Sequence, residues 1–259
     1  RDYGFTSYPL AVSNIPARLY GSLLTEAVNR QHPKLIVVDI DGFINDEDTE
    51  KLEANLRKWI DNMPWSRNRI ETIRTCVPAE LQSSFYFNIA KYHANWYQVE
   101  SWLPVQRRLR AMDKTGYSLS KGVETVCKSL PADFVPDVRP LTLSGANAQY
   151  LRDFCAQAQS IGTDVLFLRT PHRTQTTDPN VFADVAAVVG EYGYELLDLH
   201  DAFDTIGLDR CADFIDSDHL NTIGMEKFTV WFGQYLTGRY DLTGTHSEAV
   251  TAEWERCAD

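Results

Sequence analysis

The stretch KLIVVDI at positions 34–40 decides the fold of this protein. Pro33 precedes it, Gly42 follows it closely, and its apolar residues run on without alternating with polar ones. A strand with this pattern is buried on both faces, as strands are in a parallel sheet that is covered by helices. We therefore expect 34–40 to be a strand inside such a sheet.

The segments around this strand alternate between extended and helical patterns. The predicted strands are 8–12, 34–40, 164–168 and 194–199, and the predicted helices are 17–30, 146–160, 181–192 and 222–237. Strands that alternate with helices build right-handed βαβ units. The predicted fold class is therefore α/β, with a three-layer α/β/α arrangement around a flavodoxin-like, doubly wound parallel sheet.

One long segment, at about 46–145, interrupts this alternation without a convincing buried strand. We interpret residues 1–259 as a single domain that carries a helical insertion there. Apolar residues at helical spacing between Leu52 and Met63 predict one amphipathic helix in it. Four of the six tryptophans also fall in the insertion: Trp59, Trp65, Trp96 and Trp102. They form either the core of the insertion or the underside of a helical cap over the active-site edge.

Composition narrows the classes of function. The 259 residues include 25 Lys and Arg against 36 Asp and Glu, which gives a formal net charge of −11. Without a basic stripe, such a chain is not expected to bind nucleic acid or anionic membrane surfaces. No apolar run approaches the roughly 20 residues of a membrane helix. The five cysteines lack CxxC spacing; Cys155 is predicted to be buried, and a Cys211–Cys257 disulfide is left open.

Ligands of doubly wound sheets bind outside the carboxyl ends of the strands. The segments that follow the predicted strands are 13–14, 41–45, 169–173 and 210–221. The sequence contains no G-x-S-x-G, Walker A, GxGxxG or HExxH motif. Two segments remain as candidates for chemistry.

The first candidate is DIDG at 39–42. A buried strand that ends in D-x-D-G resembles the first motif of haloacid dehalogenase-like phosphatases. In that family the first Asp attacks phosphorus and both hold Mg²⁺, which implies these roles for Asp39 and Asp41. However, Phe43 stands where the family has Thr or Val, and a later G-D-x-x-x-D motif is missing. The alternative is that both carboxylates simply mark where the strand reaches solvent.

The second candidate is DFIDSDHLN at 213–221, directly before the last predicted helix. A histidine that activates a hydroxyl group is usually held in one tautomer by a carboxylate. Asp216 lies three residues before His219, so a tight loop brings its carboxylate to the ring. The alternative is a solvated acidic loop in which Asp218 or Asn221 caps the helix.

The longer segment DFIDSDHLNTIGMEKFTVWFGQYL at 213–236 resembles the closing block of SGNH (GDSL-type) hydrolases, an α/β/α fold with its Asp and His in D-x-x-H. Further stretches resemble other blocks of a branch found in bacterial surface and envelope proteins: GFTSY at 4–8, PKLIVV at 33–38, YHANW at 92–96, KG at 121–122, and 165–171. The resemblance implies a serine ester hydrolase or O-acyltransferase. Its substrate would be an acyl ester of a small molecule, glycan or cell-envelope component, and its location extracytoplasmic, secreted or at the cell surface.

In this family His219 would take the proton of the nucleophile and Asp216 would orient the ring, with no metal or organic cofactor. Family members carry the nucleophile on a strand that ends in Gly-x-Ser, ahead of the block that GFTSY resembles. This chain begins at Arg1, so we expect the nucleophile upstream of it. Ser7 and Ser13 lie near the expected edge but not in a strand–turn–helix setting.

Five further residues are candidates for contacts with the oxyanion or the substrate. Ser13, Asn14 and Asn45 are candidate oxyanion donors or substrate-lining residues, although GFIN at 42–45 differs from the Gly-x-Asn-Asp block of the family. Arg169 and His172 follow a predicted strand and are candidate substrate contacts, with plain surface charge as the alternative. Two other functions stay open: the Mg²⁺-dependent phosphatase, and a relative that binds envelope material without catalysis. The sequence leaves the oligomeric state undetermined.

Overall fold

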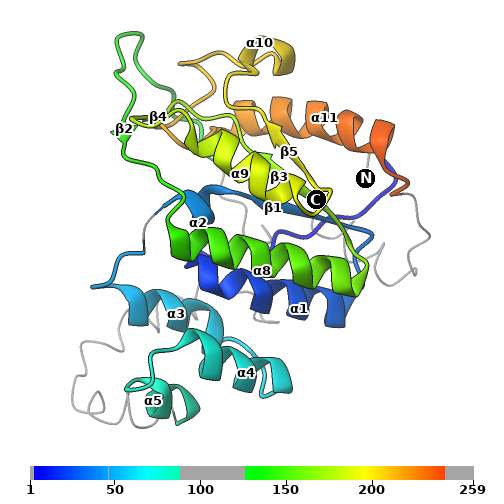
Figure 1. The fold of residues 1–259 in the computed structure, drawn as a ribbon. Coiled ribbons are helices and arrows are strands. Elements are labelled where there is room, and N and C mark those ends of the chain that lie inside the picture. The colour runs from blue at the N-terminus through cyan, green and yellow to red at the C-terminus, as the bar shows by residue number, and fades with distance from the viewer. Residues whose placement is uncertain (1–2, 46, 88–125, 243–259) are drawn as a thin grey trace, which may run out of the picture.

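The computed structural model describes residues 3–45, 47–87 and 126–242 of the chain. Its central sheet consists of three parallel strands in the order β1-β3-β5, which comprise Leu35–Asp39, Asp164–Arg169 and Glu195–Asp198 (Figure 1). Val37 is paired with Leu166, and Leu168 with Leu197. Three of the predicted strands, 34–40, 164–168 and 194–199, are therefore confirmed.

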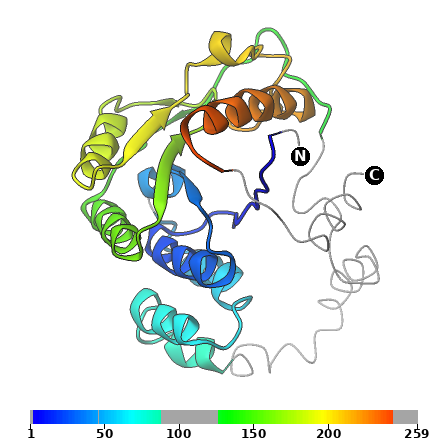
Figure 2. The same ribbon diagram turned by 90° about the vertical axis from the view of Figure 1, so that its right-hand side faces the viewer.

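Helices cover both faces of this sheet (Figure 2). One face carries α1 (Tyr20–Gln31), which continues a short 3₁₀ turn at Ala17–Leu19, together with α8 (Gly145–Ile161) and α9 (Val181–Gly190). Their buried side chains pack against Val38, Val165 and Phe167 of the strands. The opposite face carries α10 (Phe203–Ile206) and α11 (Thr222–Arg239), whose aromatic residues pack near Leu168 and Leu197. The mixed α/β class is confirmed, and the arrangement is compatible with three α/β/α layers.

The prediction of a strand at 8–12 is wrong. These residues form no strand; Tyr8 is 58% exposed and Leu10 is 39% exposed. Pro9 has no N–H for a sheet ladder, which disfavours a strand here. The preceding Tyr3 lies against the other layer, because its hydroxyl donates to the carbonyl of Val230 at 2.9 Å. The segment therefore connects the side of α11 with the start of α1 rather than joining the sheet.

The expectation that β1 is buried on both faces is also only half correct. Val38 is 6% exposed on the side of α1 and α8, but Val37 is 38% exposed on the side of α11. The reason is the position of β1 at the edge of the sheet, because α11 packs over the strands β3 and β5. Within residues 3–45, 47–87 and 126–242, no strand pairs with the second edge of β1.

The described part of the insertion is mainly helical. It contains α3 (Leu52–Ile60), α4 (Arg67–Cys76) and α5 (Gln82–Tyr86), which follow the short α2 (Asp41–Ile44). The predicted amphipathic helix is confirmed as α3. Trp59 is buried in the core that α3 forms with α4 and α1, and its Nε1 donates to Ser22 Oγ at 2.9 Å. Trp65 is 62% exposed, whereas Trp96, Trp102 and the segments YHANW and KG lie outside the described residues.

A strand near the end of the insertion pairs with a short strand that follows β3. They are β2 (Val138–Arg139) and β4 (Gln175–Thr176), which pair in parallel. Cys155 is fully buried in α8, as predicted, and Cys211 is a free thiol, while Cys257 lies outside the described residues. Among the helices that the structure describes, none combines the length and apolar character needed to cross a membrane.

Candidate functional site

The three parallel strands bring polar side chains to one edge of the sheet. Asp39 ends β1, Arg169 ends β3 and Asp198 ends β5, and parallel strands have their carboxyl ends at the same edge. The loop 210–221 reaches this edge between α10 and α11. Its Ser217 carbonyl accepts hydrogen bonds from the backbone N–H groups of Arg173 and Thr174, which follow β3. The predicted candidate loop therefore lies where ligands of such sheets bind.

This loop brings Asp216 and His219 together. Nδ1 of His219 lies 3.0 Å from each carboxylate oxygen of Asp216, which confirms the predicted contact. The backbone N–H groups of Asp218 and His219 also donate to Asp216 Oδ1, both at 2.8 Å. With Nδ1 held by the carboxylate, Nε2 is the nitrogen that can accept a proton. The His219 side chain is 69% exposed, so solvent and small molecules can reach the ring.

The same contacts set the charge of the carboxylate. Partial burial acts to raise the pKa of Asp216, but hydrogen bonds from the N–H of Asp218 and from the ring and N–H of His219 outweigh it. They hold the pKa of Asp216 below its usual range. An ionised Asp216 can accept the Nδ1 proton and stabilise an imidazolium ion if His219 takes up a second proton.

The loop has this shape because its ends are anchored in the fold. Phe214 is fully buried and forms an isolated β-bridge with Leu220. Asn221 is the cap of α11: its Oδ1 accepts from the N–H of Gly224 at 3.0 Å, and its Nδ2 donates to the carbonyl of Ala212 at 2.5 Å. A Cβ at Gly224 would lie 2.4 Å from the carbonyl oxygen of Asp213, so only glycine fits there. Helix capping and a dyad loop are thus both present in the same segment.

Asp39 and Asp41 lie at the same edge. Asp39 accepts hydrogen bonds from the N–H of Asp41 at 2.9 Å and from the hydroxyl of Thr170 at 3.4 Å, so its carboxylate is engaged in structural contacts. Burial raises the pKa of Asp41 to about 7, helped by the charges of Asp39 and Asp218 and opposed by Arg169 and Arg139. No group of three or more His, Cys, Asp and Glu in the described part of the chain is arranged to hold a metal ion.

Arg169 is the last residue of β3 and His172 follows it, so both lie at the predicted strand end, but their side chains are buried. Arg169 Nη1 pairs with Asp198 at 3.2 Å, and its guanidinium lies over the Phe182 ring. His172 is 4% exposed, and its ring centroid lies 4.5 Å from that of His200. Among the residues that the structure describes, neither ring nitrogen of His172 has a hydrogen-bond partner. Contact of these side chains with a substrate stays a prediction.

His172 is held in its neutral form by its surroundings. Burial lowers its pKa to about 4, and the neighbouring His200 and Arg169 act in the same direction. His200 is not among the residues predicted from the sequence, although it follows the strand 194–199 and the same strand-end rule points to it. The two histidines are therefore a neutral pair beneath the carboxyl edge of β3 and β5.

The other predicted residues are used elsewhere. Ser13 and Asn14 are exposed in a turn beside α3, where the Ser13 carbonyl accepts from Lys58 Nζ at 3.0 Å and Asn14 has a left-handed φ of 53°. Asn45 closes α2, because its Nδ2 donates to the carbonyl of Asp41 at 2.7 Å. No hydrogen bond between described residues joins these three side chains to Asp216 or His219. Their role as oxyanion donors or substrate-lining residues stays a prediction.

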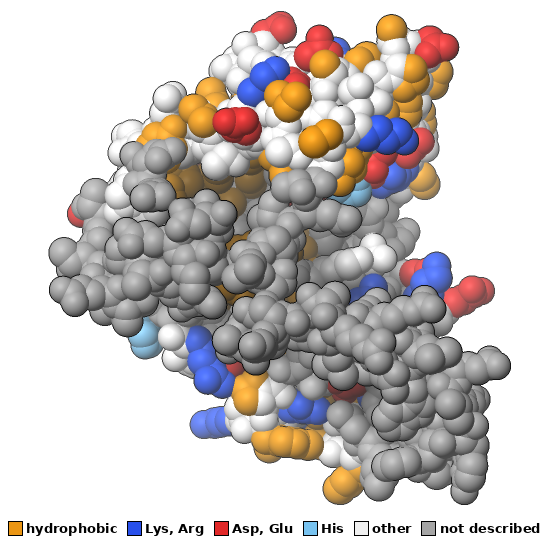
Figure 3. Space-filling view, turned by 180° about the vertical axis from the view of Figure 1, so that it is seen from behind, with side chains coloured by type: hydrophobic (Ala, Val, Ile, Leu, Met, Phe, Trp, Pro, Cys, Tyr) orange, Lys and Arg blue, Asp and Glu red, His pale blue; other side chains and the backbone are white. Residues whose placement is uncertain are grey.

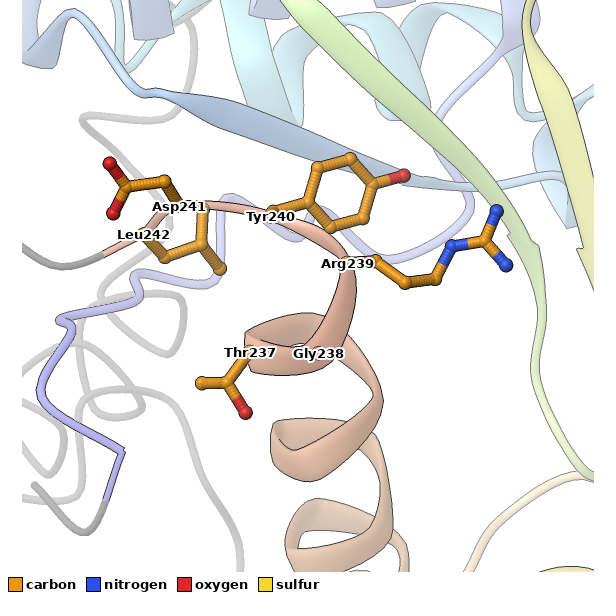
Figure 4. A pocket seen from close by; sticks show the side chains of 6 residues that line it. All are labelled: Thr237, Gly238, Arg239, Tyr240, Asp241 and Leu242. Carbon is orange, nitrogen blue, oxygen red and sulfur yellow. The ribbon is translucent and has the colours of Figure 1, made fainter.

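A surface hollow at the far end of α11 is separate from this site. Six residues line it: Thr237, Gly238, Arg239, Tyr240, Asp241 and Leu242 (Figure 4). It lies at the C-terminal end of an 18-residue helix whose first turn adjoins His219. A helix of that length extends about 27 Å. The hollow is therefore too distant to take part in chemistry at the dyad.

The surface of the described residues carries acidic and basic side chains mixed with apolar ones, with no continuous basic area in the view of Figure 3. No family model, no curated protein and no solved structure matches this chain. The arrangement of side chains at the carboxyl edge of the sheet is therefore the basis for a functional hypothesis.

Proposed function

We propose that this protein is an SGNH-type serine ester hydrolase or O-acyltransferase. Its substrate would be an acyl ester on a carbohydrate or another cell-envelope component, outside the cytoplasm. The observation that carries the proposal is the contact of His219 Nδ1 with both oxygens of Asp216, at 3.0 Å, in a loop at the carboxyl edge of a parallel sheet. In this chemistry Nε2 takes the proton of the serine hydroxyl and then gives it to the leaving group.

The charges at the edge suit this role. Asp216 is ionised at neutral pH, because its hydrogen bonds hold its pKa below the usual range. An imidazolium that forms during attack on the ester is stabilised by this carboxylate, which does not itself become protonated. Exposure of the His219 ring gives a bulky glycan ester room to approach.

The second edge of β1, with which no described strand pairs, is the place that we propose for the strand carrying the nucleophile. No strand of residues 3–45, 47–87 or 126–242 pairs with it, and Val37 beside it is 38% exposed. A parallel strand at this edge would end next to Asp39, at the same end of the sheet as the dyad loop. We propose that a strand ending in Gly-x-Ser, from a segment upstream of residue 1, occupies this edge.

One observation favours the second candidate, an Mg²⁺-dependent phosphatase. The pKa of Asp41 is raised to about 7, which suits a general acid and base near neutral pH. In that chemistry Asp39 would have to attack phosphorus. Both of its carboxylate oxygens, however, already accept hydrogen bonds, from the N–H of Asp41 and from Thr170. We therefore rank the phosphatase below the esterase.

One experiment separates the two functions. Hydrolysis of p-nitrophenyl acetate and of p-nitrophenyl phosphate is measured with Mg²⁺ or with EDTA, for a form of the protein that includes the proposed upstream strand and for its His219→Ala and Asp39→Asn variants. The esterase proposal expects acetate hydrolysis that EDTA leaves unchanged and His219→Ala lowers by at least ~10²-fold. Phosphate release that needs Mg²⁺, disappears in Asp39→Asn and survives in His219→Ala would refute the esterase proposal in favour of the phosphatase. Activity on neither substrate, with binding of envelope glycan, would indicate the non-catalytic relative.

A further inference from the structure

The loop that carries the dyad is fastened to its neighbours through the carboxylate of Asp218. Arg139, which belongs to β2, donates from Nη2 to Oδ2 of Asp218 at 2.5 Å. Thr174, which directly precedes β4, donates from its hydroxyl to Oδ1. Thr174 is 2% exposed, so its hydroxyl has little water as an alternative partner. Both oxygens of Asp218 are thus held from the β2/β4 pair.

The preceding residue is held from the same side. The carbonyl of Ser217 accepts from the N–H groups of Arg173 and Thr174 at 2.6 and 3.1 Å. The hydroxyl of Ser217 accepts from the N–H of Asp137 at 2.9 Å. The two residues between Asp216 and His219 are therefore both tied to the segments that lead into β2 and β4.

The fixed Asp218 acts directly on the dyad. Its own N–H donates to Asp216 Oδ1 at 2.8 Å, the oxygen that also accepts from the N–H of His219. We propose that Arg139 and Thr174 are positioning residues, which act through Asp218 to hold Asp216 against the His219 ring. The catalytic consequence of this inference rests on the proposed esterase function, but the positioning itself does not.

The positive charge of Arg139 also compensates the negative charges of the loop. The loop places Asp216 and Asp218 close together, and the negative charge of Asp218 also contributes to the raised pKa of Asp41. Arg139 also donates to Asp137, at 3.3 Å, so one guanidinium bridges two carboxylates. Burial acts to lower the pKa of Arg139, but the hydrogen bonds and charges of Asp218 and Asp137 together outweigh it and raise the pKa. Without this cation, like charges would push the loop away from β1.

The test uses the matched variants Thr174→Val and Thr174→Ser. Valine keeps the shape of threonine and removes the hydroxyl, whereas serine keeps the hydroxyl. Hydrogen exchange of the His219 backbone N–H is followed by NMR, together with the ¹⁵N shifts of its ring nitrogens. We expect the backbone N–H of His219 to exchange about tenfold faster in Thr174→Val, because the hydrogen bond from the Thr174 hydroxyl to the Asp218 carboxylate is lost. The ring should also change from one Nδ1–H tautomer to a mixture, while Thr174→Ser stays close to the unaltered protein.

Two further variants complete the design. Arg139→Met should reproduce the effect of Thr174→Val, whereas Arg152→Met, which removes a surface arginine paired with Glu191, should not. The amides of β3 report on overall stability and should keep their protection. The inference would be overturned if the His219 N–H exchanged at the same rate in Thr174→Val and Thr174→Ser. It would also be overturned if the β3 amides lost as much protection as the His219 N–H. All readouts are made without substrate. If these exchange results hold but the chain extended by the upstream strand is inactive, only the esterase proposal is refuted.

Discussion

His219 Nδ1 lies 3.0 Å from both carboxylate oxygens of Asp216, and the backbone N–H of the same histidine donates to Oδ1 at 2.8 Å. The aspartate therefore fixes both the ring and the backbone of a residue only three positions away. Both side chains are more than half exposed, at 69% and 52%, and exposed ion pairs contribute about 0–1 kcal/mol to stability. The contact therefore orients the His219 ring and contributes little to the stability of the fold.

Replacing the dyad should separate stability from activity. We expect His219→Ala and Asp216→Asn to change the free energy of unfolding by less than about 1 kcal/mol, since the pair is exposed. Ester hydrolysis by an active form of the protein should fall by roughly 10²- to 10⁴-fold in each variant. Urea unfolding and initial rates on p-nitrophenyl acetate measure the two effects. Full activity in His219→Ala would rule out the proposed mechanism.

Stability should depend on pH through His172. Its pKa is lowered to about 4 in the folded protein, whereas an unfolded histidine titrates near 6.5. Below about pH 6.5 the unfolded chain therefore binds more protons at this residue, so its contribution to stability is complete above pH 6.5 and is lost as the pH falls toward 4. The loss amounts to about 3 kcal/mol at pH 4. Unfolding of His172→Gln should lack this part of the pH dependence, and an identical slope in both proteins would contradict it.

Asp41 should have the opposite pH dependence. Its pKa is raised to about 7 by burial and by the charges of Asp39 and Asp218, so its ionisation opposes folding. This cost begins to grow above the unfolded pKa, near pH 4, and is complete above pH 7. We expect Asp41→Asn to raise the melting temperature at pH 8 and to leave it unchanged at pH 3.5. Scanning calorimetry at both values measures this, and an equal shift at both would show that charge is not the cause.

The position of the nucleophile can be tested by chain length. We expect residues 1–259 alone to have little esterase activity, and a longer chain that supplies an upstream strand ending in Gly-x-Ser to be active. The reason is the second edge of β1, with which no strand of residues 3–45, 47–87 or 126–242 pairs and where such a strand would end close to the dyad loop. Strong activity of residues 1–259 that disappears in Ser7→Ala or Ser13→Ala would place the nucleophile within this segment instead.

Features that depend on short stretches were determined by the sequence itself. The run KLIVVDI predicts β1, and apolar residues at helical spacing predict α1, α3, α8, α9 and α11. The contact between Asp216 and His219 could also be predicted, because residues three apart in a tight loop meet without help from the rest of the chain. Backbone geometry and side-chain reach over a few residues decide these features.

Features that depend on distant partners were decided only by the tertiary structure. The pattern at 8–12 is extended, but a strand needs a neighbour, and this segment has none among the described residues. Arg139 lies 79 positions before Asp218, and no spacing rule relates them. His172 and His200 become a neutral pair only because the parallel pairing of β3 and β5 brings their loops together, which buries the His172 ring and leaves the His200 side chain 17% exposed. Burial and long-range pairing depend on the packing of the entire domain, which local patterns in the sequence do not encode.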